Sequence, residues 1–284
     1  MINVQDLIFT YPGQKEPTIQ SMNFNIRKGE IFGFLGPSGA GKSTTQKILI
    51  GVLKGYQGSV KVMDIEIKDI GPNYYERIGV AFEFPNFYTK FSVLENLKLF
   101  RSLYSGRTEN PITLLEKVGL ENAKHMKVSQ LSKGMKMRLN FCRALLNDPD
   151  ILFLDEPTSG LDPVNSKQMK DLILEKKKEG KTVLITTPNM QAAEELCDRV
   201  AFIVDGQIKL IDSPRELKLR KGQKRIIVEY RKDGELMSST FPQLGIGENS
   251  SFLSLIRDYS IETMHSQEAS LEQIFIEVTG RELI

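Results

Sequence analysis

The stretch GPSGAGKST, residues Gly36 to Thr44, decides the fold of this chain. It fits the pattern G-x-x-x-x-G-K-[ST], with a short apolar run before it, Ile31 to Leu35, and a helix pattern after it that begins at Lys42. Glycines in such a loop let backbone N–H groups curl around phosphate oxygens, and the following helix N-terminus adds a favourable partial charge. An ordinary glycine-rich turn is the alternative, but the flanking strand and helix favour a phosphate site.

The side chains of this loop have separate expected roles. Lys42 can reach the β- and γ-phosphates of a nucleotide, and the Ser43 hydroxyl can bind Mg²⁺. The other loop residues are expected to surround the phosphates: Gly36, Pro37, Ser38, Gly39, Ala40, Gly41 and Thr44.

A second motif, ILFLDEP at Ile151 to Pro157, ends a predicted buried strand on two acidic residues. Asp155 is expected at the carboxyl end of the strand, where ligands bind in open α/β sheets, and to hold Mg²⁺ through water. Glu156 is a candidate general base for an attacking water. Such a pair is more often a solvated turn when it stands alone, but the phosphate loop favours the functional interpretation here.

Apolar runs alternate with helix patterns along the first three quarters of the chain. Strands are predicted at Ile2–Tyr11, Met22–Ile26, Ile31–Leu35, Val60–Ile67, Ile78–Phe82, Ile151–Leu154, Val183–Thr186 and Val200–Val204. The segment from Ser92 to Asn147 is predicted to be mostly helical. Strands that alternate with helices indicate an α/β fold with a mainly parallel sheet and helices on its faces.

A change of composition between Pro214 and Gly222 predicts a domain boundary. We expect a nucleotide-binding domain at residues 1–217, with a helical subdomain at about 88–147, and a small α+β accessory domain at 218–284. In the accessory domain, the runs Ile226–Tyr230 and Glu235–Phe241 flank Lys232-Asp233-Gly234, which is a hairpin signal. Helices are predicted there at Leu253–Arg257 and Leu271–Val278.

The totals exclude several classes of protein. The composition is ordinary for a globular protein, and a net charge of +2 is too small to indicate nucleic acid or an anionic membrane as partner. Cys142 and Cys197 have no metal-ligand spacing and are expected to be reduced. The lysine clusters at 176–178 and 218–225 are interpreted as solvated faces. We expect no signal peptide and no membrane span, so that any membrane role goes through a partner.

The segment VSQLSKGMKMRLNFCRALLNDP, Val128 to Pro149, makes a resemblance specific. With the two motifs above, it is similar to the ATP-binding subunits of ABC transporters, which carry a signature close to Leu-Ser-Gly-Gly-Gln at a helix start. Here the corresponding residues are Leu131-Ser132-Lys133-Gly134-Met135. The resemblance covers residues 2 to about 215, and the ending SLEQIFIEVTGREL resembles the appendage of many bacterial exporter-type ATPases.

The resemblance implies a dimer in which two such subunits enclose two ATP molecules. Each nucleotide meets the phosphate loop of one chain and the signature of the other, so Ser132, Lys133, Gly134 and Met135 are implied to contact ATP. Tyr11 corresponds to the aromatic residue that stacks on adenine, although a strand-end tyrosine is equally consistent with the chemistry. Asp162 belongs to the loop Ser159-Gly160-Leu161-Asp162, which is implied to couple the two nucleotide sites.

This chain departs from the family pattern at the signature and at the residue after the strand at 78–82. Glu83 replaces a glutamine that contacts Mg²⁺, so a metal ligand is still expected, with added negative charge near the γ-phosphate. Lys133 and Met135 replace the first glycine and the glutamine of the signature, and Lys133 adds a cation near phosphate.

Pro188, in TVLITTPNM, stands where the family usually has a histidine that touches the terminal phosphate. Proline has no side-chain donor and no backbone N–H. The only histidines of the chain, His125 and His265, are far from it in the sequence. We therefore expect this site to bind ATP and to hydrolyse it slowly. Thr187 is also expected to cap a helix that begins at Pro188.

The resemblance implies an ATP hydrolase that drives export by ATP-driven dimerisation. Its implied partners are a polytopic membrane permease and either a second copy of the chain or a different ATP-binding subunit, at the cytoplasmic face of the cell membrane. The helices that begin near Ser92 are implied to receive the membrane subunit.

Two alternatives stay open at this point. A soluble ABC-type ATPase acting on nucleic acid or the ribosome is disfavoured by the near-neutral charge and the lack of coiled-coil heptads. A regulatory module that binds ATP with little hydrolysis is favoured by Pro188. The intact set of Lys42, Ser43, Asp155 and Glu156 disfavours it.

Overall fold

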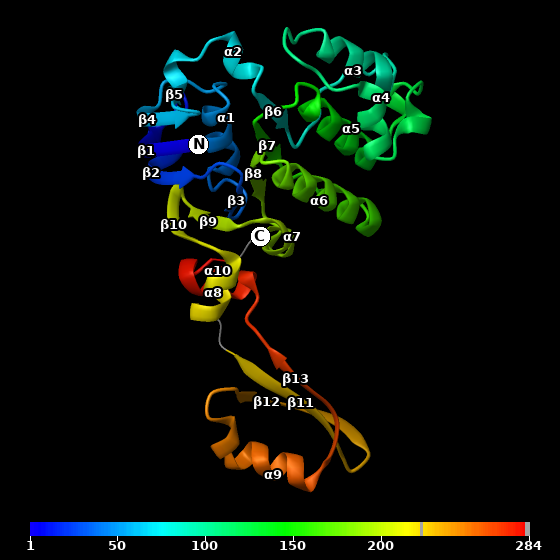
Figure 1. Cartoon of the computed structure of the whole chain (residues 1–284). Coiled ribbons are helices and arrows are strands. Elements are labelled where there is room, and N and C mark those ends of the chain that lie inside the picture. The colour runs from blue at the N-terminus through cyan, green and yellow to red at the C-terminus, as the bar shows by residue number, and fades with distance from the viewer. Residues whose placement is uncertain (222–223, 282–284) are drawn as a thin grey trace. The chain divides into compact units, whose positions relative to one another are not determined.

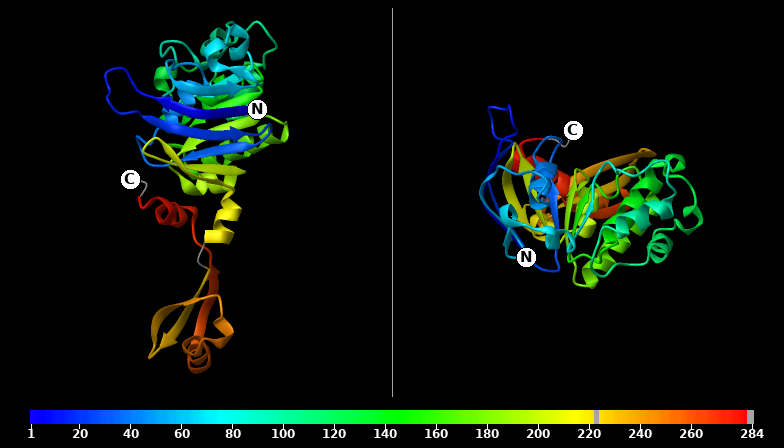
Figure 2. Two further views of the ribbon diagram at one scale, coloured as in Figure 1. Left: turned by 90° about the vertical axis from the view of Figure 1, so that its left-hand side faces the viewer. Right: turned by 90° about the horizontal axis from the view of Figure 1, so that it is seen from above.

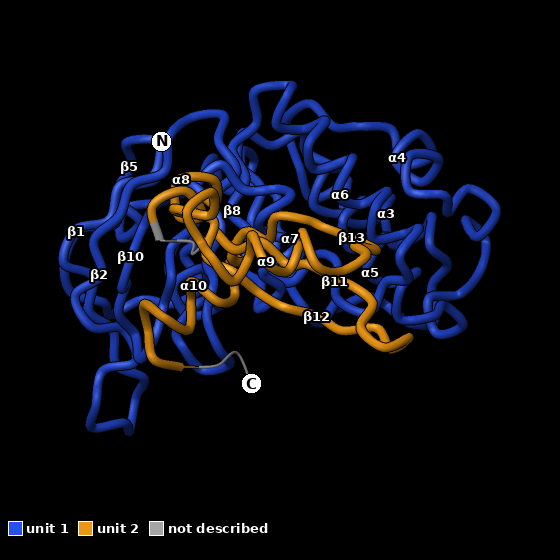
Figure 3. Tube along the Cα trace, turned by 90° about the horizontal axis from the view of Figure 1, so that it is seen from below, with its two compact units in different colours: residues 1–213, 282–284 blue, residues 214–281 orange. Residues whose placement is uncertain are grey.

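A computed structural model describes residues 1–221 and 224–281 of the chain. They form two compact units, residues 1–213 and residues 214–281 (Figure 3). The first unit contains two sheets and the second unit one, and each unit has its own core.

A six-stranded sheet forms the centre of the first unit, in the strand order β10-β9-β3-β8-β7-β6. Its members are β3 (Ile31–Leu35), β6 (Ile78–Ala81), β7 (Ile151–Asp155), β8 (Thr182–Thr187), β9 (Arg199–Val204) and β10 (Gln207–Asp212). All neighbours pair in parallel except β10, which runs antiparallel to β9. Every residue of β3, β7 and β8 is buried, which explains why these strands read as continuous apolar runs. The predicted α/β class with a mainly parallel sheet is confirmed.

A second, antiparallel sheet with the order β2-β1-β4-β5 was not separated from the first by the sequence pattern. It consists of β1 (Ile2–Phe9), β2 (Ile19–Ile26), β4 (Gln57–Val62) and β5 (Ile65–Glu66). Phe24 of β2 packs edge-on against Phe34 of β3, with ring centroids 5.2 Å apart, and both belong to one core cluster. The single strand predicted at 60–67 is two strands, because the turn residues Met63 and Asp64 have φ of 52° and 65°.

Helices follow the strands of the first unit and include a separate group on one side. They are α1 (Lys42–Leu49), α2 (Pro72–Tyr75), α3 (Val93–Arg101), α4 (Pro111–Lys117), α5 (Lys133–Leu145), α6 (Pro163–Lys178) and α7 (Met190–Leu196). Within this unit, α3, α4 and α5 lie together on the side opposite the antiparallel sheet (Figures 1 and 2). Ser92 is the N-cap residue of α3 and forms a reciprocal capping box with Glu95.

The described part of the second unit combines a three-stranded antiparallel sheet, in the order β12-β11-β13, with three α-helices. Its elements are α8 (Pro214–Lys221), β11 (Arg225–Lys232), β12 (Glu235–Pro242), α9 (Ser250–Asp258), β13 (Ser260–Gln267) and α10 (Leu271–Thr279). The predicted hairpin is present, with Asp233 and Gly234 at φ of 52° and 86°, as a two-residue type I′ turn requires. Phe252 of α9 packs edge-on against Phe241 of β12. The strand β13 was not predicted.

The structure corrects two local expectations. Helix α7 begins at Met190 and is capped by Asn189, whose side chain accepts the N–H of Ala192, so Thr187 does not cap a helix that starts at Pro188. Thr187 is instead the last residue of β8, and its Oγ1 accepts the N–H of Asn189. The lysine cluster at 176–178 is not wholly a solvated face, because Lys176 is only 8% exposed and pairs with Glu179.

Both cysteines are buried and unpaired. Among the described residues, the structure has no helix that is long and apolar enough to cross a membrane.

Candidate functional site

A cavity of about 440 Å³ opens where several strands of the first unit end. Its walls come from five segments that are far apart in the sequence. They are Tyr11, Gln14 and Thr18 after β1, the phosphate-loop residues Ser38, Gly39, Gly41, Lys42, Ser43 and Thr44, and the single residues Glu83, Glu156 and Pro188. The last three follow β6, β7 and β8, which are neighbours in the parallel sheet, so their carboxyl ends meet at one edge.

The phosphate loop closes around its own lysine. Lys42 Nζ donates hydrogen bonds to the carbonyl oxygens of Gly36, at 2.7 Å, and Pro37, at 2.9 Å. Gly41 precedes α1 with φ of 101°, and a Cβ atom there would lie 2.7 Å from Ile19 Cδ1. Only glycine meets both requirements at this position. The loop therefore holds an ammonium group at a helix N-terminus, which is an arrangement suited to phosphate oxygens.

Burial and three carboxylates have opposite effects on the pKa of Lys42. Burial lowers the pKa of Lys42, while the negative charges of Glu156, Asp155 and Glu83 act in the opposite direction. Three carboxylates thus act electrostatically on the ammonium group. A triphosphate that entered the cavity would meet this cation and would have to be shielded from the carboxylates.

Asp155 and the hydroxyl groups of Ser43 and Thr186 form a group of oxygen atoms beside the loop. Ser43 Oγ donates to Asp155 Oδ1 at 3.3 Å, and Thr186 Oγ1 donates to the same carboxylate oxygen. Mg²⁺ prefers such oxygen ligands and usually keeps several waters. Among the described residues no cluster of three or more acidic, histidine or cysteine side chains could hold a metal ion alone. The residues present fit an Mg²⁺ that takes its other ligands from phosphate and water.

Glu156 is held in an unusual backbone conformation at the end of β7. Its φ is 49°, and its N–H donates to the carbonyl oxygen of Thr186 at 2.9 Å. Burial raises the pKa of its carboxyl group, and the charges of Glu83 and Asp155 raise it further, against Lys42 and Lys133. A carboxylate with a raised pKa that faces a phosphate pocket can accept a proton from water.

The predicted signature residues lie outside this cavity. Ser132 caps α5 by accepting the N–H of Met135 at 3.2 Å. Lys133 and Gly134 lie against residues 160–161: a Cβ atom on Gly134 would be 3.3 Å from Leu161 Cδ2, and one on Gly160 would be 3.0 Å from Lys133 Cδ.

Asp162, at the end of this loop, caps α6 by accepting the N–H groups of Val164 and Asn165. The structure thus joins Ser132–Met135 to the loop 159–162 of the same chain, and it does not bring either segment to the lining of the cavity.

Other expected residues lie behind the lining or at its rim. Gly36, Pro37, Ala40 and Asp155 do not line the cavity, but they belong to or contact the loop that does. Tyr11 reaches it from β1, and its hydroxyl is 3.2 Å from Thr44 Oγ1.

Two lining residues, Gln14 and Thr18, were missed by the sequence reasoning. They are joined by a hydrogen bond from Thr18 Oγ1 to Gln14 Oε1 at 3.1 Å. The turn residues Pro12, Gly13 and Pro17 around them were the only available signal.

Comparison with known proteins shows the family of this chain. A family model described as "ABC transporter" matches residues 19–159, and one described as "Fluoroquinolone efflux ABC transporter C-terminal domain" matches residues 224–268. A fluoroquinolones export ATP-binding protein of Mycobacterium tuberculosis is 53% identical over all of this chain and 94% of that protein.

This chain belongs to the ATP-binding subunits of ABC transporters. A Nod factor export ATP-binding protein I of Burkholderia pseudomallei is 35% identical, over 94% of this chain and 93% of that protein. Among solved structures, a dimeric ATP-binding cassette in a post-hydrolysis state with ADP and Pi is 28% identical, with a TM-score of 0.68. The structural match covers 75% of this chain and 98% of the solved cassette.

This ABC subunit is accordingly an ATP-binding and ATP-hydrolysing component of an export transporter. A soluble ATPase that works on nucleic acid or the ribosome is not favoured by these relatives.

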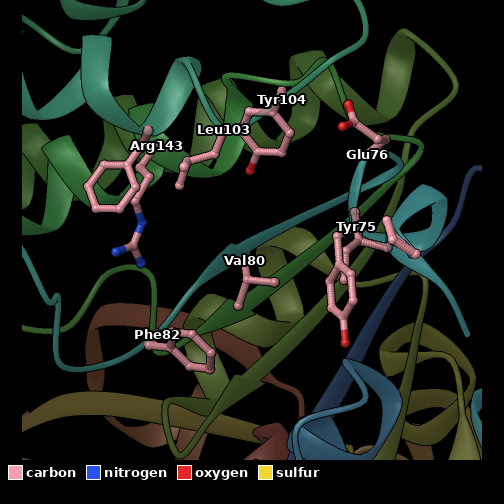
Figure 4. A pocket seen from close by; sticks show the side chains of 10 residues that line it. Tyr75, Glu76, Val80, Phe82, Leu103, Tyr104 and Arg143 are labelled. Carbon is pink, nitrogen blue, oxygen red and sulfur yellow. The ribbon is translucent and has the colours of Figure 1, made fainter.

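The ABC subunit has a second cavity, of about 430 Å³, between β6 and the helical group. Figure 4 shows Leu103, Tyr104 and Arg143 on one side, facing Val80 and Phe82. The remaining lining residues are Pro72, Tyr75, Glu76, Ile78 and Phe100. The walls are mainly apolar, and the side chain of Leu103 is 72% exposed. An exposed apolar hollow with one cation and one carboxylate is typical of a protein-binding surface.

Proposed function

We propose that this chain powers the export of small organic molecules, fluoroquinolones among them, by hydrolysing ATP in the cavity at the phosphate loop. The observation that carries the site assignment is the meeting of Lys42, Ser43, Glu83 and Glu156 in one cavity. The proposed cargo rests on the fluoroquinolone export relative, whose 53% identity extends over this whole chain, including its second unit.

Each residue has a proposed role in ATP hydrolysis. Lys42 binds the β- and γ-phosphates, with the backbone of Gly36–Thr44 around them, and Tyr11 contacts the adenine. Ser43, Asp155 and Glu83 would hold Mg²⁺, which supplies charge neutralisation on the phosphate oxygens. Glu156 takes a proton from the attacking water as the oxygen–phosphorus bond forms and ADP leaves. The raised pKa of Glu156 suits this task, because it makes the carboxylate a stronger base.

We further propose that turnover at this site is slow. Pro188 lines the cavity at the end of β8 and has no group that can donate a hydrogen bond to phosphate or water. One missing transition-state contact typically slows a step by roughly 100- to 1000-fold. If turnover at this site were slowed to almost nothing, the chain would act as a regulatory subunit that binds ATP with little hydrolysis.

We propose that the working unit is a dimer, with a second copy or a related ATP-binding subunit. The signature residues Ser132, Lys133, Gly134 and Met135 do not line the cavity at their own phosphate loop, and we propose that they contact the nucleotide of a second subunit. Asp162 lies in the adjoining loop, where the two sites would communicate. The solved cassette that is 28% identical to this chain is itself dimeric, which supports the same arrangement here.

We propose that the second cavity is the binding site for a polytopic membrane permease. Its apolar walls and the exposed Leu103 suit a short helix from such a partner. The chain would then be peripheral, at the cytoplasmic face of the cell membrane. We assign residues 1–217 to the nucleotide domain, with its helical subdomain at about 88–147, and residues 218–284 to an accessory domain.

The test is drug transport into inverted membrane vesicles that contain the chain and its permease. We expect ATP-dependent uptake of a fluoroquinolone, and loss of uptake when the chain carries Glu156→Gln. Drug-independent ATP turnover without any uptake would contradict the cargo and leave the ATPase in place. Failure of the purified chain to bind or hydrolyse ATP would contradict the site assignment itself.

A further inference from the structure

The strand β12 forms an open edge of the three-stranded sheet in the second unit. Among residues 1–221 and 224–281, β12 pairs with β11 alone, in unbroken register from Lys232↔Glu235 to Arg225↔Pro242. Leu236 and Met237 on this strand, and Leu244 just after it, are 59%, 41% and 95% exposed. A long, regular edge strand with exposed apolar side chains is a ready template for pairing with another strand.

The opposite edge, β13, carries the features that normally prevent such pairing. Its register with β11 shifts between Glu229 and Tyr230, which marks a bulge. Glu262 lies within this shift and pairs with Arg231, and His265 follows on the same strand. In contrast, the only charged residue of β12 is Glu235 at its beginning, and its only proline, Pro242, is its last residue. The two edges of one small sheet therefore differ in the properties that control edge pairing.

The turn fixes which backbone groups of β12 are free. In a two-residue hairpin, the residues that flank the turn form a hydrogen-bonded pair, and such pairs alternate along the ladder. Glu235, Met237, Ser239 and Phe241 therefore bond to β11. Leu236, Ser238 and Thr240 direct their N–H and C=O groups away from it, toward the open edge.

We propose that β12 pairs antiparallel with β12 of a second copy of this chain, and so joins two three-stranded sheets into one. A strand that meets itself antiparallel about a two-fold axis makes an isologous contact, which closes a dimer. When the axis passes through Ser238, Ser238 faces itself and Leu236 faces Thr240 of the second copy. Glu235 faces Phe241, so no like charges oppose each other.

The second copy is the occupant that the chain itself favours. In this register Glu235, the only charged residue of the strand, faces an aromatic ring and no second charge, and Pro242, which has no N–H to donate, lies beyond the paired residues 235–241. The inference also rests on the proposed dimer of ATP-binding subunits. In that dimer the second units of two chains share one assembly, and the effective concentration of one β12 for the other is high.

A single cysteine at the centre of the strand tests the pairing. Directly opposed residues of antiparallel strands have Cα atoms roughly 4.5–5.5 Å apart, which lies within the range that a disulfide spans. The native thiols give no background, because Cys142 and Cys197 are both buried. We expect mild oxidation of the full-length Ser238→Cys chain to give a disulfide-linked dimer. The matched control Ser266→Cys places a thiol on β13 at the opposite edge and is expected to give at least about tenfold less.

Two further variants measure the pairing without oxidation. The N–H of Ser238 points to the open edge, so Ser238→Pro removes an edge donor while it spares the ladder with β11. Ser238→Lys leaves the backbone intact and places two like charges opposite each other. We expect both variants to raise the dimer dissociation constant of the full chain by at least about tenfold in sedimentation, while each still binds ATP.

Distinct results separate this inference from the proposed function. Equal cross-linking at positions 238 and 266, or unchanged dimerisation in both Ser238→Pro and Ser238→Lys, would overturn the pairing even if ATP turnover is normal. Cross-linking of Ser238→Cys to a membrane subunit, in place of a second copy, would overturn it as well. Cross-linking of two copies by a chain that does not hydrolyse ATP would support the pairing and contradict the ATPase assignment.

Discussion

Pro188 and Glu156 line the same cavity from the ends of adjacent parallel strands, β8 and β7. The side chain beside the proposed general base is therefore a ring without a hydrogen-bond donor. The chain has only two histidines, and the structure describes both, His125 and His265, outside the lining of this cavity. Any loss of activity at position 188 is thus not made up by another imidazole.

Pro188→His is expected to raise the ATP turnover of the purified chain by at least about tenfold, because one transition-state contact is worth roughly 100- to 1000-fold. Steady-state phosphate release at saturating ATP measures the effect. Pro188→Ala is the matched control, since it removes the proline ring without adding a side-chain donor. Equal rates for the histidine variant and the unmodified chain would show that position 188 does not limit hydrolysis.

Glu156→Gln is expected to reduce turnover by roughly 100-fold or more, since the amide cannot accept the proton of the attacking water. Binding of ATP should persist, because the phosphate loop and Lys42 are unchanged. Isothermal titration with ATP and single-turnover hydrolysis separate the two quantities. A variant that keeps most of its turnover would assign the base to another group.

Glu83→Gln is expected to move the acid limb of the pH–rate profile to lower pH. The charge of Glu83 raises the pKa of Glu156, so its removal lets the base lose its proton at lower pH. The measurement is kcat/KM across pH with saturating Mg²⁺. Glu272→Gln, an exposed position on α10, is the control and should leave the profile in place.

Leu103→Glu is expected to prevent co-purification of the chain with its membrane subunit. The change places a charge in the mainly apolar cavity at β6, while the nucleotide cavity has none of its lining changed. Leu253→Glu, on the exposed side of α9, is the control. Retained co-purification of Leu103→Glu together with intact ATP binding would place the permease on another surface.

Glu66→Gln is expected to lower the free energy of unfolding at pH 7 by about 1–2 kcal/mol, since a hydrogen bond to a charged group contributes roughly 1.5–3 kcal/mol and solvent reduces this at the partly exposed Glu66. Its carboxylate accepts hydrogen bonds from Tyr56, at 2.8 Å, Ser59, at 2.8 Å, and the N–H of Val60, at 3.0 Å. Burial raises the pKa of Glu66, but these hydrogen bonds outweigh it and hold the pKa below its usual value.

A carboxyl group whose pKa is lowered by folding stabilises the protein above its unfolded pKa, near about 4.3, and loses this effect as the pH falls through its folded value. The difference between the unmodified chain and Glu66→Gln should therefore shrink below about pH 4. Urea unfolding at pH 7 and pH 3.5 measures it. A difference that is the same at both pH values would show that the carboxylate charge has no part in it.

The sequence predicted the elements that contain a continuous apolar run or a specific turn. The strand at 31–35 and the helix start at Lys42 agree with the structure, because an apolar run and a glycine loop define them locally. The hairpin at Asp233-Gly234 was predictable for the same reason, since both residues accept the left-handed conformation.

Features that depend on tertiary contacts were not predictable. β13 reads as a polar segment, and it is a strand because β11 offers it a partner. Lys176 was interpreted as solvated because its neighbours are lysines, but in the structure it is buried beside Glu179. Gln14 and Thr18 reach the nucleotide cavity only because β1 and β2 bring their loop there, which no local pattern encodes.

The two buried thiols, Cys142 and Cys197, can report where the structure opens locally. Cys142 lies in α5, and its thiol donates to the carbonyl oxygen of Leu114; Cys197 follows α7, against Gly33 of the central sheet. Burial raises the pKa of both thiols, so a thiol reagent can modify them only when the surrounding structure opens. The modification rates of Cys142 and Cys197 would therefore show whether the helical group opens separately from the sheet, without any mutation.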